Sequence, residues 1–376
     1  MQWRRGVVCA LGMLALAGGA PCTSPSPTTP RPPSVAALTS DPGPASVAPP
    51  VTGGLRPPGT AGAPAPSARV HLTAAGDYAA NVATTGGVLR ALALSGSDAH
   101  LALGDLSYGS PGGESAWCSF VTSRVGTSFP FELLSGNHES NGTNGSIARF
   151  ASCLPNRLGG AVGDYARQYY VDLPRSSPLV RVVLVSPGLT FPDGTWSYAA
   201  GSARYAWTAA AIDGARRAGI RWVVVAMHEP CLSMGRYGCS SGPDLQHLLV
   251  SKHVDLVLSG HEHLYQRTKQ LREGTGCARI AVGSYVPACV ADADTSMVAG
   301  AGTVFATIGT GGVALRQVAA TDPERGYFAA TSGAATNPTY GFADLRVTSG
   351  ELRFSFVRGA GGSFTDSWVL RRTPPG

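Results

Sequence analysis

Four stretches of the sequence place metal-binding residue types directly after an apolar run: residues 104–108, 136–139, 227–229 and 260–263. A fifth run, residues 70–75, is followed within two residues by an aspartate. Because ligands collect at the carboxyl ends of strands in open α/β sheets, these side chains can meet at one edge. Carboxylate, imidazole and phenol groups suit iron, zinc or manganese, and two such clusters can hold two metals that share a carboxylate. The candidates are Asp77, Asp105, Tyr108, Asn137, His138, His228, His261 and His263.

The elements that must position these residues alternate between strands and helices over residues 70–260, which favours an α/β architecture. Strands are predicted for residues 70–75, 100–103, 130–135, 169–173, 179–185, 221–227 and 254–259, and helices for residues 87–94, 114–125, 203–218 and 243–251. Farther along, strands are predicted for residues 278–282, 304–308, 341–347 and 351–357. Gly-rich turns separate them, and Ser349-Gly350 is expected to close a hairpin between the last two. The C-terminal part should therefore be more antiparallel.

Composition indicates a folded protein with a substantial core. Hydrophobic residues make up 44% and charged residues 14% of the 376 residues, which is enough for one large domain or two ordinary ones. The formal net charge of +6 comes almost entirely from arginine. Since no dense basic run is interleaved with aromatic residues, nucleic-acid binding is not expected. A mildly positive surface still favours anionic substrates.

The N-terminal part predicts export. Residues 1–20 resemble an export signal, because an Arg-Arg pair precedes a short apolar stretch that ends in small residues. The arginine pair leaves a twin-arginine signal open as an alternative. Residues 21–68 consist mainly of Pro, Ser, Thr, Ala and Gly, which predicts a disordered linker. We expect a secreted or cell-envelope-associated protein, attached to a membrane only if Cys22 is lipidated, and Pro21 at the cleavage position argues against lipidation.

Cysteine usage agrees with export. Six cysteines follow the leader region, and an even number in an exported protein favours disulfides. None of the six forms a Cys-x-x-Cys pair, which argues against the alternative of a zinc site. Proximity in the sequence suggests the pairs Cys118–Cys153, Cys231–Cys239 and Cys277–Cys289.

Taken together, the motifs show a clear family resemblance. Gly104-Asp105-Leu106-Ser107-Tyr108, Gly136-Asn137-His138-Glu139, His228 and the run from Gly260 to Arg267 resemble the ordered motifs of the metallophosphoesterase (calcineurin-like) superfamily. Within that superfamily they are most similar to the purple acid phosphatases. The resemblance spans roughly residues 70–370 and implies a β-sandwich flanked by helices in four αββα layers. It predicts a metallophosphoesterase catalytic domain over residues 69–372.

The resemblance also implies roles for individual residues. Asp77, Asp105, Tyr108 and His263 match the ligands of a ferric ion, and Asp105, Asn137, His228 and His261 match those of a divalent Zn, Fe or Mn ion, so that Asp105 bridges the two metals. His138 matches the histidine that contacts the phosphate and protonates the leaving group. Glu139 and Glu262 are expected to support the motifs from behind the ligands.

Two departures from the family pattern affect these expectations. The superfamily usually has a histidine two residues after the first aspartate, whereas this chain has Ala79, and Tyr108 can supply the missing ligand. A phenolate is a hard anionic donor that holds Fe(III) well and would colour the protein. The purple acid phosphatases also carry further histidines after the position of His228, and here Arg236 and Tyr237 are expected to bind the phosphate instead.

The sequence thus predicts an exported binuclear metal-dependent phosphoester hydrolase of purple acid phosphatase type. The expected reaction is in-line attack of a metal-bound hydroxide on the phosphomonoester of a small molecule. A phosphodiesterase on the same scaffold is the first alternative. A non-catalytic cell-wall-associated binding protein is the second, and the complete set of seven ligand positions argues against it.

Overall fold

The computed structural model describes residues 68–79, 82–154 and 156–372. The chain divides into two units, residues 1–62 and 63–376, and the first unit lies outside the described residues. The predicted export signal, Cys22 and nearly all of the predicted linker also lie outside them. Within the described ranges, no helix combines the length and the apolar character needed to cross a membrane.

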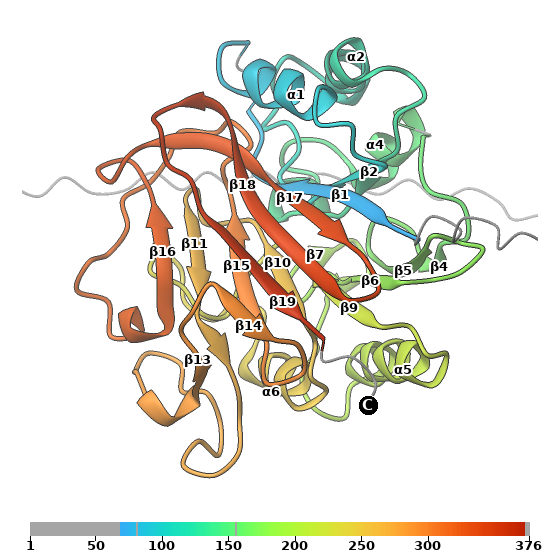
Figure 1. Ribbon diagram of the computed structural model, residues 1–376. Helices are drawn as coiled ribbons and strands as arrows, with labels where there is room; N and C mark the ends of the chain where they lie inside the picture. The colour runs from blue at the N-terminus through green and yellow to red at the C-terminus, as the bar shows by residue number, and fades with distance from the viewer. Residues whose placement is uncertain (1–67, 80–81, 155, 373–376) are drawn as a thin grey trace, which may run out of the picture. The chain divides into compact units, whose positions relative to one another are not determined.

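Two large mixed sheets form the centre of the second unit (Figure 1). The seven-stranded sheet has the order β14-β19-β18-β17-β1-β2-β3, with bounds β1 Val70–Ala75, β2 Ala99–Ala102, β3 Phe131–Leu133, β14 Ser296–Val298, β17 Thr339–Val347, β18 Glu351–Gly361 and β19 Ser367–Arg371. The eight-stranded sheet has the order β16-β11-β15-β10-β9-β6-β5-β4, with bounds β4 Val162–Asp164, β5 Gln168–Leu173, β6 Val180–Leu184, β9 Trp222–Ala226, β10 Leu256–Ser259, β11 Tyr265–Thr268, β15 Val304–Ile308 and β16 Phe328–Ser332.

Helices flank this pair of sheets, as the predicted α/β architecture requires (Figure 1). Helix α1 packs on β18 and on α2, α2 packs on α4, and α5 packs on β6. The helices are α1 Thr85–Ala93, α2 Glu114–Val125, α3 Asn137–Ser140, α4 Ile147–Cys153, α5 Ala203–Arg217 and α6 Pro243–Ser251, with 3-10 turns at Pro287–Cys289 and Arg325–Tyr327. Two small sheets complete the elements: β7 Thr190–Phe191 with β8 Gly194–Thr195, and β12 Gln270–Leu271 with β13 Val290–Asp292.

The directions of the strands explain where the loops that carry the candidate ligands lie. Strands β1, β2 and β3 run parallel, as do β6, β9, β10 and β15, so their carboxyl ends share an edge in each sheet. In contrast, β17, β18 and β19 pair antiparallel, and β17 and β18 are joined by the predicted Ser349-Gly350 turn. The prediction of a more antiparallel C-terminal part is therefore confirmed.

Aromatic side chains fill the space between the two sheets. The Tyr265 ring on β11 lies 4.8 Å from the Phe356 ring on β18 and 5.1 Å from the Phe364 ring, measured between centroids. Its hydroxyl donates to Asp366, which also forms a 2.6 Å ion pair with the buried Arg267. The end of the last sequence motif is thus anchored by packing and by an ion pair between the sheets.

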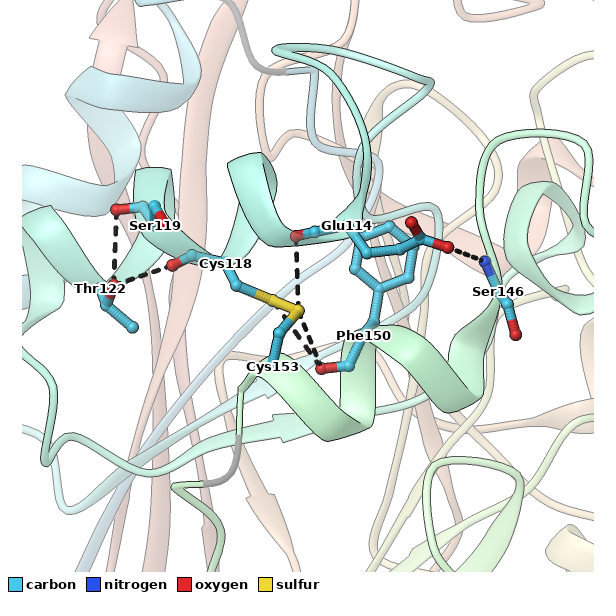
Figure 2. The surroundings of a disulfide bond; sticks show 7 residues. All are labelled: Glu114, Cys118, Ser119, Thr122, Ser146, Phe150 and Cys153. Atoms are coloured by element: carbon cyan, nitrogen blue, oxygen red, sulfur yellow. Dashed lines mark hydrogen bonds between the residues drawn. A yellow bond between two sulfur atoms is a disulfide. The ribbon is translucent and has the colours of Figure 1, made fainter.

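All three predicted disulfides are present: Cys118–Cys153, Cys231–Cys239 and Cys277–Cys289. Figure 2 shows the first, which ties α2 to α4. Beside it, the Glu114 carboxylate accepts a 2.9 Å hydrogen bond from the Ser146 backbone N–H at the start of α4. The disulfide and this hydrogen bond hold the two helices together.

The strand predicted for residues 278–282 is wrong. These residues lie in the loop closed by Cys277–Cys289 and do not pair with any described strand. Their alternating apolar pattern suggested a half-buried strand, but only Ile280 is buried, while Val282 is 40% exposed. The disulfide fixes the ends of this loop, so the segment does not need a ladder of hydrogen bonds to be ordered.

Candidate metal centre

The predicted ligands meet where the carboxyl ends of both sheets come together. In the seven-stranded sheet, Asp77 follows β1, Asp105 follows β2, and Asn137 follows β3 as the first residue of α3. In the eight-stranded sheet, His228 follows β9, while His261 and His263 lie between β10 and β11. Several hydrogen bonds join the sheets at this edge; for example, the Gly76 N–H donates to Ile308 O at 2.9 Å, and His228 Nδ1 donates to Leu103 O at 2.7 Å.

Asp105 lies at the centre of the cluster. The Tyr108 hydroxyl donates to Asp105 Oδ2 at 2.8 Å, and the His138 N–H donates to Oδ1 at 3.1 Å. His228 Nε2 lies 3.3 Å from the same Oδ1. Asp77, Asp105 and His228 each place one possible ligand atom within 4.8 Å of the others, and all three are buried. This spacing is what a shared cation needs.

The remaining candidates are linked to this core. The Tyr108 hydroxyl also lies 3.1 Å from Asp77 Oδ1 and 3.1 Å from His263 Nε2. Asn137 Oδ1 lies 3.2 Å from His228 Nε2. The His261 ring packs edge-on against the His228 ring at 5.0 Å, and its backbone N–H donates to Asp77 Oδ2 at 2.8 Å. All seven predicted ligands therefore belong to one connected cluster.

Asp105 and His228 hold each other in the charged form although burial opposes both charges. Burial and the Asp105 charge raise the pKa of Asp77, although the His228 charge opposes them. Burial alone would raise the pKa of Asp105, but the charge and hydrogen bond of His228 hold it well below its usual range. Burial would lower the pKa of His228, and the Asp105 carboxylate instead raises it to about 10. Without a metal, a protonated His228 therefore neutralises Asp105.

The other donors fit a metal ion by their protonation. Burial lowers the pKa of His261 to about 3 and that of His263 to about 4, so both imidazoles are neutral at neutral pH and can offer a lone pair. Burial and the two neighbouring carboxylates raise the pKa of the Tyr108 phenol. A cation between these carboxylates would reverse that effect and favour the phenolate. Two carboxylates, a phenol, an amide and three imidazoles form a donor set that fits two such ions.

The backbone around the ligands is held in an unusual conformation. Asp77, Asp105, Tyr108 and His261 have φ angles of 62°, 53°, 49° and 68°, in the left-handed region that costs about 1–2 kcal/mol for most residues. The motif glycines leave the room that these ligands need. A Cβ on Gly136 would lie 2.1 Å from Asp105 Oδ1, so no other residue fits there. Strain concentrated on predicted ligands indicates a functional site rather than a simple turn.

Two buried glutamates hold the loops that carry the ligands. Glu139 accepts hydrogen bonds from the backbone N–H groups of Asp105 at 2.9 Å and Gly136 at 2.7 Å. Glu262 accepts from the Arg236 N–H at 2.9 Å and the Ser233 hydroxyl at 3.1 Å. Neither carboxylate is free to serve as a ligand, which agrees with the supporting role expected for both.

The predicted phosphate-binding residues lie at the rim of the cluster. The loop closed by Cys231–Cys239 carries the exposed Arg236 and the half-buried Tyr237. The Tyr237 ring stacks on the His261 ring, with centroids 4.3 Å apart. The Arg236 guanidinium lies 5.7 Å from the Tyr237 ring, on the outer side of the loop. The structure thus brings Tyr237 against a predicted ligand and leaves Arg236 at the solvent boundary.

Sequence reasoning missed two residues at this site. Asn144 Oδ1 is hydrogen-bonded to His138 Nδ1, which fixes the orientation of that ring. Arg316 lies with its guanidinium 5.0 Å from the Tyr237 ring, and its Nη1 donates to His261 O at 3.3 Å. Asn144 occurs in a Gly- and Asn-rich segment typical of a turn, and Arg316 follows a Gly-rich turn far along the chain. Neither has a local sequence signal that links it to a metal motif.

Comparisons with known proteins agree with this arrangement. The profile of the calcineurin-like phosphoesterase family matches residues 70–265. Two uncharacterised proteins from strains of Mycobacterium tuberculosis are each 31% identical over 172 residues, covering 39% of this chain. The match spans 29% of the length of those relatives.

Solved structures share the fold. A purple acid phosphatase from yellow lupin (Lupinus luteus) seeds superposes with a TM-score of 0.59 at 17% identity, over 81% of this chain and 54% of the lupin chain. GAP50, the anchor in the inner membrane complex of Plasmodium, superposes with a TM-score of 0.51 at 15% identity, over 81% of this chain and 90% of its own. At these identities the likeness extends to the fold alone.

Proposed function

This chain belongs to the calcineurin-like phosphoesterase family, and from that premise we propose that it is a binuclear phosphoester hydrolase of purple acid phosphatase type. The observation that carries the proposal is the single cluster formed by all seven predicted ligands around Asp105. The structure of a binding protein would not require every one of these positions to be filled by a metal-binding residue. The Tyr108 hydroxyl hydrogen-bonds to the carboxylates of both Asp77 and Asp105, which supports the purple acid phosphatase type in particular.

The residues present fit two metal ions. Asp77, Asp105, Tyr108 and His263 would hold a ferric ion, and Asp105, Asn137, His228 and His261 would hold a divalent Zn, Fe or Mn ion. When bound, the metals would supply positive charge that neutralises the phosphate and lowers the pKa of the attacking water. The neutral imidazoles of His261 and His263 and the phenol of Tyr108 are the donors that distinguish this set from a site built of carboxylates alone.

His138 is suited to move the proton that the leaving group needs. Its Nδ1 is held by Asn144 Oδ1, so Nε2 is the atom that faces the cluster, 3.7 Å from Asp105 Oδ2. The His138 side chain is 30% exposed, so a bound phosphoester can reach it. In the proposed reaction, His138 donates a proton from Nε2 to the oxygen of the departing alcohol. Tyr237 and Arg236 would border the phosphate from the opposite side of the cluster.

We also propose the organisation of the whole chain. Residues 1–20 would direct export, residues 21–68 would form a linker, and residues 69–372 would form the catalytic domain. The three disulfides support an oxidising compartment outside the cytoplasm. Sequencing the N-terminus of the mature protein recovered from culture medium and from cell envelopes would test the export signal and the fate of Cys22 together.

One experiment tests the hydrolase proposal. The full-length protein, purified and reconstituted with iron plus zinc or manganese, should contain about two metal equivalents and hydrolyse a panel of phosphomonoesters. Elemental analysis and phosphate release measure the two outcomes independently. The same panel extended to phosphodiesters separates the monoesterase from a diesterase on this scaffold. Metal-replete protein without any activity on either class would contradict the proposal.

A further inference from the structure

Arg316 projects from a backbone segment that is hydrogen-bonded to the predicted metal ligands themselves. The segment leaves the carboxyl end of β15 and runs beside ligand loops of both sheets. The Val313 N–H donates to Asp77 O at 3.0 Å, and the Arg316 N–H donates to His263 O at 2.8 Å. Ala314 O lies 3.3 Å from His263 Nδ1. These contacts fix the place of Arg316 at the candidate metal centre.

The guanidinium of Arg316 lies at the rim of the cluster. Its Nη1 donates to His261 O at 3.3 Å, and its central carbon is 5.0 Å from the Tyr237 ring, which stacks on the His261 ring. The Glu262 carboxylate is 3.9 Å from Nη1 and already accepts hydrogen bonds from the Arg236 and Tyr237 N–H groups. Among the described residues, no carboxylate therefore lies within hydrogen-bonding distance of the Arg316 charge.

The other edge of this guanidinium is open to a ligand. Nε and Nη2 of Arg316 donate to no described residue, and the side chain is 27% exposed, so both nitrogens keep contact with solvent. Elsewhere in the chain, Arg181 uses this same pair of nitrogens to bind Asp172, at 2.6 and 2.7 Å. Arg267 binds Asp366 in the same way. Such a fork of two donors also matches two oxygens of a phosphate.

Arg316 is better held for this task than Arg236, the arginine that the sequence suggests. The Arg236 side chain is exposed, and no described residue accepts a hydrogen bond from its guanidinium. Ordering such a free side chain on binding costs rotamer entropy. The Arg316 guanidinium is already oriented by His261 O and by the Tyr237 ring, so less entropy is lost when a ligand binds to it.

From this geometry we infer that Arg316 binds the phosphoryl group of the substrate through Nε and Nη2, and that it favours phosphomonoesters over phosphodiesters. The inference rests on the proposed hydrolase function and adds a substrate-binding residue and a substrate class. A phosphomonoester carries about 1.5 to 2 negative charges near pH 7, whereas a diester carries one. Because electrostatic attraction is proportional to each charge, the guanidinium stabilises the bound monoester more.

The test uses the metal-loaded, full-length protein with p-nitrophenyl phosphate and bis(p-nitrophenyl) phosphate, a monoester and a diester that share a leaving group. Arg316→Gln should raise KM for the monoester and the inhibition constant of inorganic phosphate by about 10- to 100-fold, the range expected for hydrogen bonds to a charged group. Since the phosphoryl charge is present in both the bound substrate and the transition state, kcat should stay within about threefold. The diester should lose only about 3- to 10-fold in kcat/KM, because it carries about half the charge.

Matched variants separate phosphate binding from a general effect of losing an arginine. Arg316→Lys keeps the charge without the fork and should recover part of the phosphate affinity. Arg236→Gln should weaken phosphate binding less than Arg316→Gln does. Arg353→Gln removes a half-exposed arginine beside Arg346, which faces His71 at the start of β1, whereas the candidate centre follows the end of that strand. It should change neither constant.

Two further measurements distinguish binding from positioning. Elemental analysis and thermal unfolding of Arg316→Gln should give the metal content and melting temperature of the parent protein. An unchanged inhibition constant for phosphate, equal losses on the monoester and the diester, or a loss of metal that accounts for the lost activity would overturn the inference. Lack of hydrolysis of both substrates by the metal-loaded parent would instead overturn the proposed hydrolase function.

Discussion

The two sheets supply chemically different halves of the candidate metal centre. The loops after β1, β2 and β3 of the seven-stranded sheet provide oxygen donors: the carboxylates of Asp77 and Asp105, the Tyr108 phenol and the Asn137 amide. The loops after β9 and β10 of the eight-stranded sheet provide the three imidazoles of His228, His261 and His263. Neither half by itself contains the mixed donor set of either proposed metal. The centre therefore exists only when the two sheets are packed together.

The two halves are also held in place by different means. On the oxygen side, Asp77, Asp105 and Tyr108 all have left-handed backbones, so position comes from a strained chain fixed by its neighbours; of the three histidines only His261 shares this conformation. On the nitrogen side, His228 Nδ1 donates to Leu103 O at 2.7 Å, and His263 Nδ1 lies 3.3 Å from Ala314 O. These bonds fix which ring nitrogen faces the candidate centre. Replacing one residue of the oxygen half should therefore disturb the geometry of the candidate centre more than replacing one residue of the nitrogen half.

The largest effect should come from Asp105, which both proposed metals share. Asp105→Asn keeps the shape but removes the charge that pairs with His228 and would bridge the metals. We expect kcat/KM to fall by at least about a thousandfold, equivalent to about 4 kcal/mol, with loss of at least one metal equivalent. Phosphate release and elemental analysis measure these changes. Asp213→Asn, at a partly buried ion pair with Lys252 away from the candidate centre, should alter neither quantity.

Removing the metals should loosen the junction between the sheets. The metal-free protein keeps the like charges of Asp77 and Asp105 close together, balanced mainly by His228. A metal at 100 times its dissociation constant should add about 2.7 kcal/mol to the free energy of unfolding. Calorimetry with and without a chelator measures the shift in melting temperature. In Asp105→Asn the metal should raise it far less, and an equal rise in both proteins would mean that the metal binds elsewhere.

Tyr108 tests the oxygen half alone. Tyr108→Phe removes the phenol but keeps the ring that packs 4.4 Å from the His138 ring. If the phenolate holds ferric iron, this variant should lose the visible charge-transfer band and about 10- to 100-fold in iron affinity. Absorption spectroscopy and iron titration provide the readouts. An unchanged spectrum would show that the protein is a metallophosphoesterase of another subfamily.

The contrast between the halves also explains what the sequence could predict. Strands Val70–Ala75 and Val304–Ile308 agree with the predicted ranges because they are short apolar runs that contain β-branched residues, and helix Glu114–Val125 also agrees with its predicted range. The ligands were recognisable because each follows such a strand. Asn144 and Arg316 were not, because they reach the site through the folding of loops that are distant in sequence from the motifs they touch. Their place at the site depends on tertiary packing, which the pattern of apolar residues along the sequence does not reveal.

Short elements escaped prediction for a related reason. Strands β7 and β8 have two residues each, and α3 has four, too few for a period to emerge. The false strand at residues 278–282 shows the opposite error, in which a five-residue pattern matched by chance inside a loop closed by a disulfide.

Asn144 should have a smaller effect, restricted to one step of the reaction. Asn144→Ala frees the His138 ring and should lower kcat about tenfold for alkyl phosphates, whose leaving group needs a proton. For p-nitrophenyl phosphate, whose leaving group needs none, kcat should change by less than about twofold. Asn144→Asp keeps an acceptor for Nδ1 and should restore most of the loss. Equal losses on both substrates would assign Asn144 a purely structural role.

The smallest change concerns a second junction between the sheets, away from the metals. On β3, Glu132 Oε2 lies 3.4 Å from the Tyr169 hydroxyl of β5, and burial raises the pKa of Glu132 from 4.5 to about 7. The folded state therefore binds this proton more tightly than the unfolded state. Between about pH 4.5 and pH 7 the unfolded state carries fewer protons, so the free energy of unfolding falls as pH rises through this window.

Glu132→Gln cannot titrate and should escape that fall. Relative to the parent, the variant should have the same free energy of unfolding near pH 4 and be more stable by about 1–3 kcal/mol near pH 8. The Gln oxygen can accept from the Leu158 N–H, and its NH2 group can donate to the Tyr169 hydroxyl, which itself donates to Leu133 O. Urea unfolding of the metal-free proteins at the two pH values measures this difference. Glu351→Gln, at a half-exposed ion pair with Arg353, should differ from the parent by less than about 0.5 kcal/mol at both. A Glu132→Gln variant that is less stable at pH 8 than the parent would mean that this carboxylate stabilises the junction in its charged form.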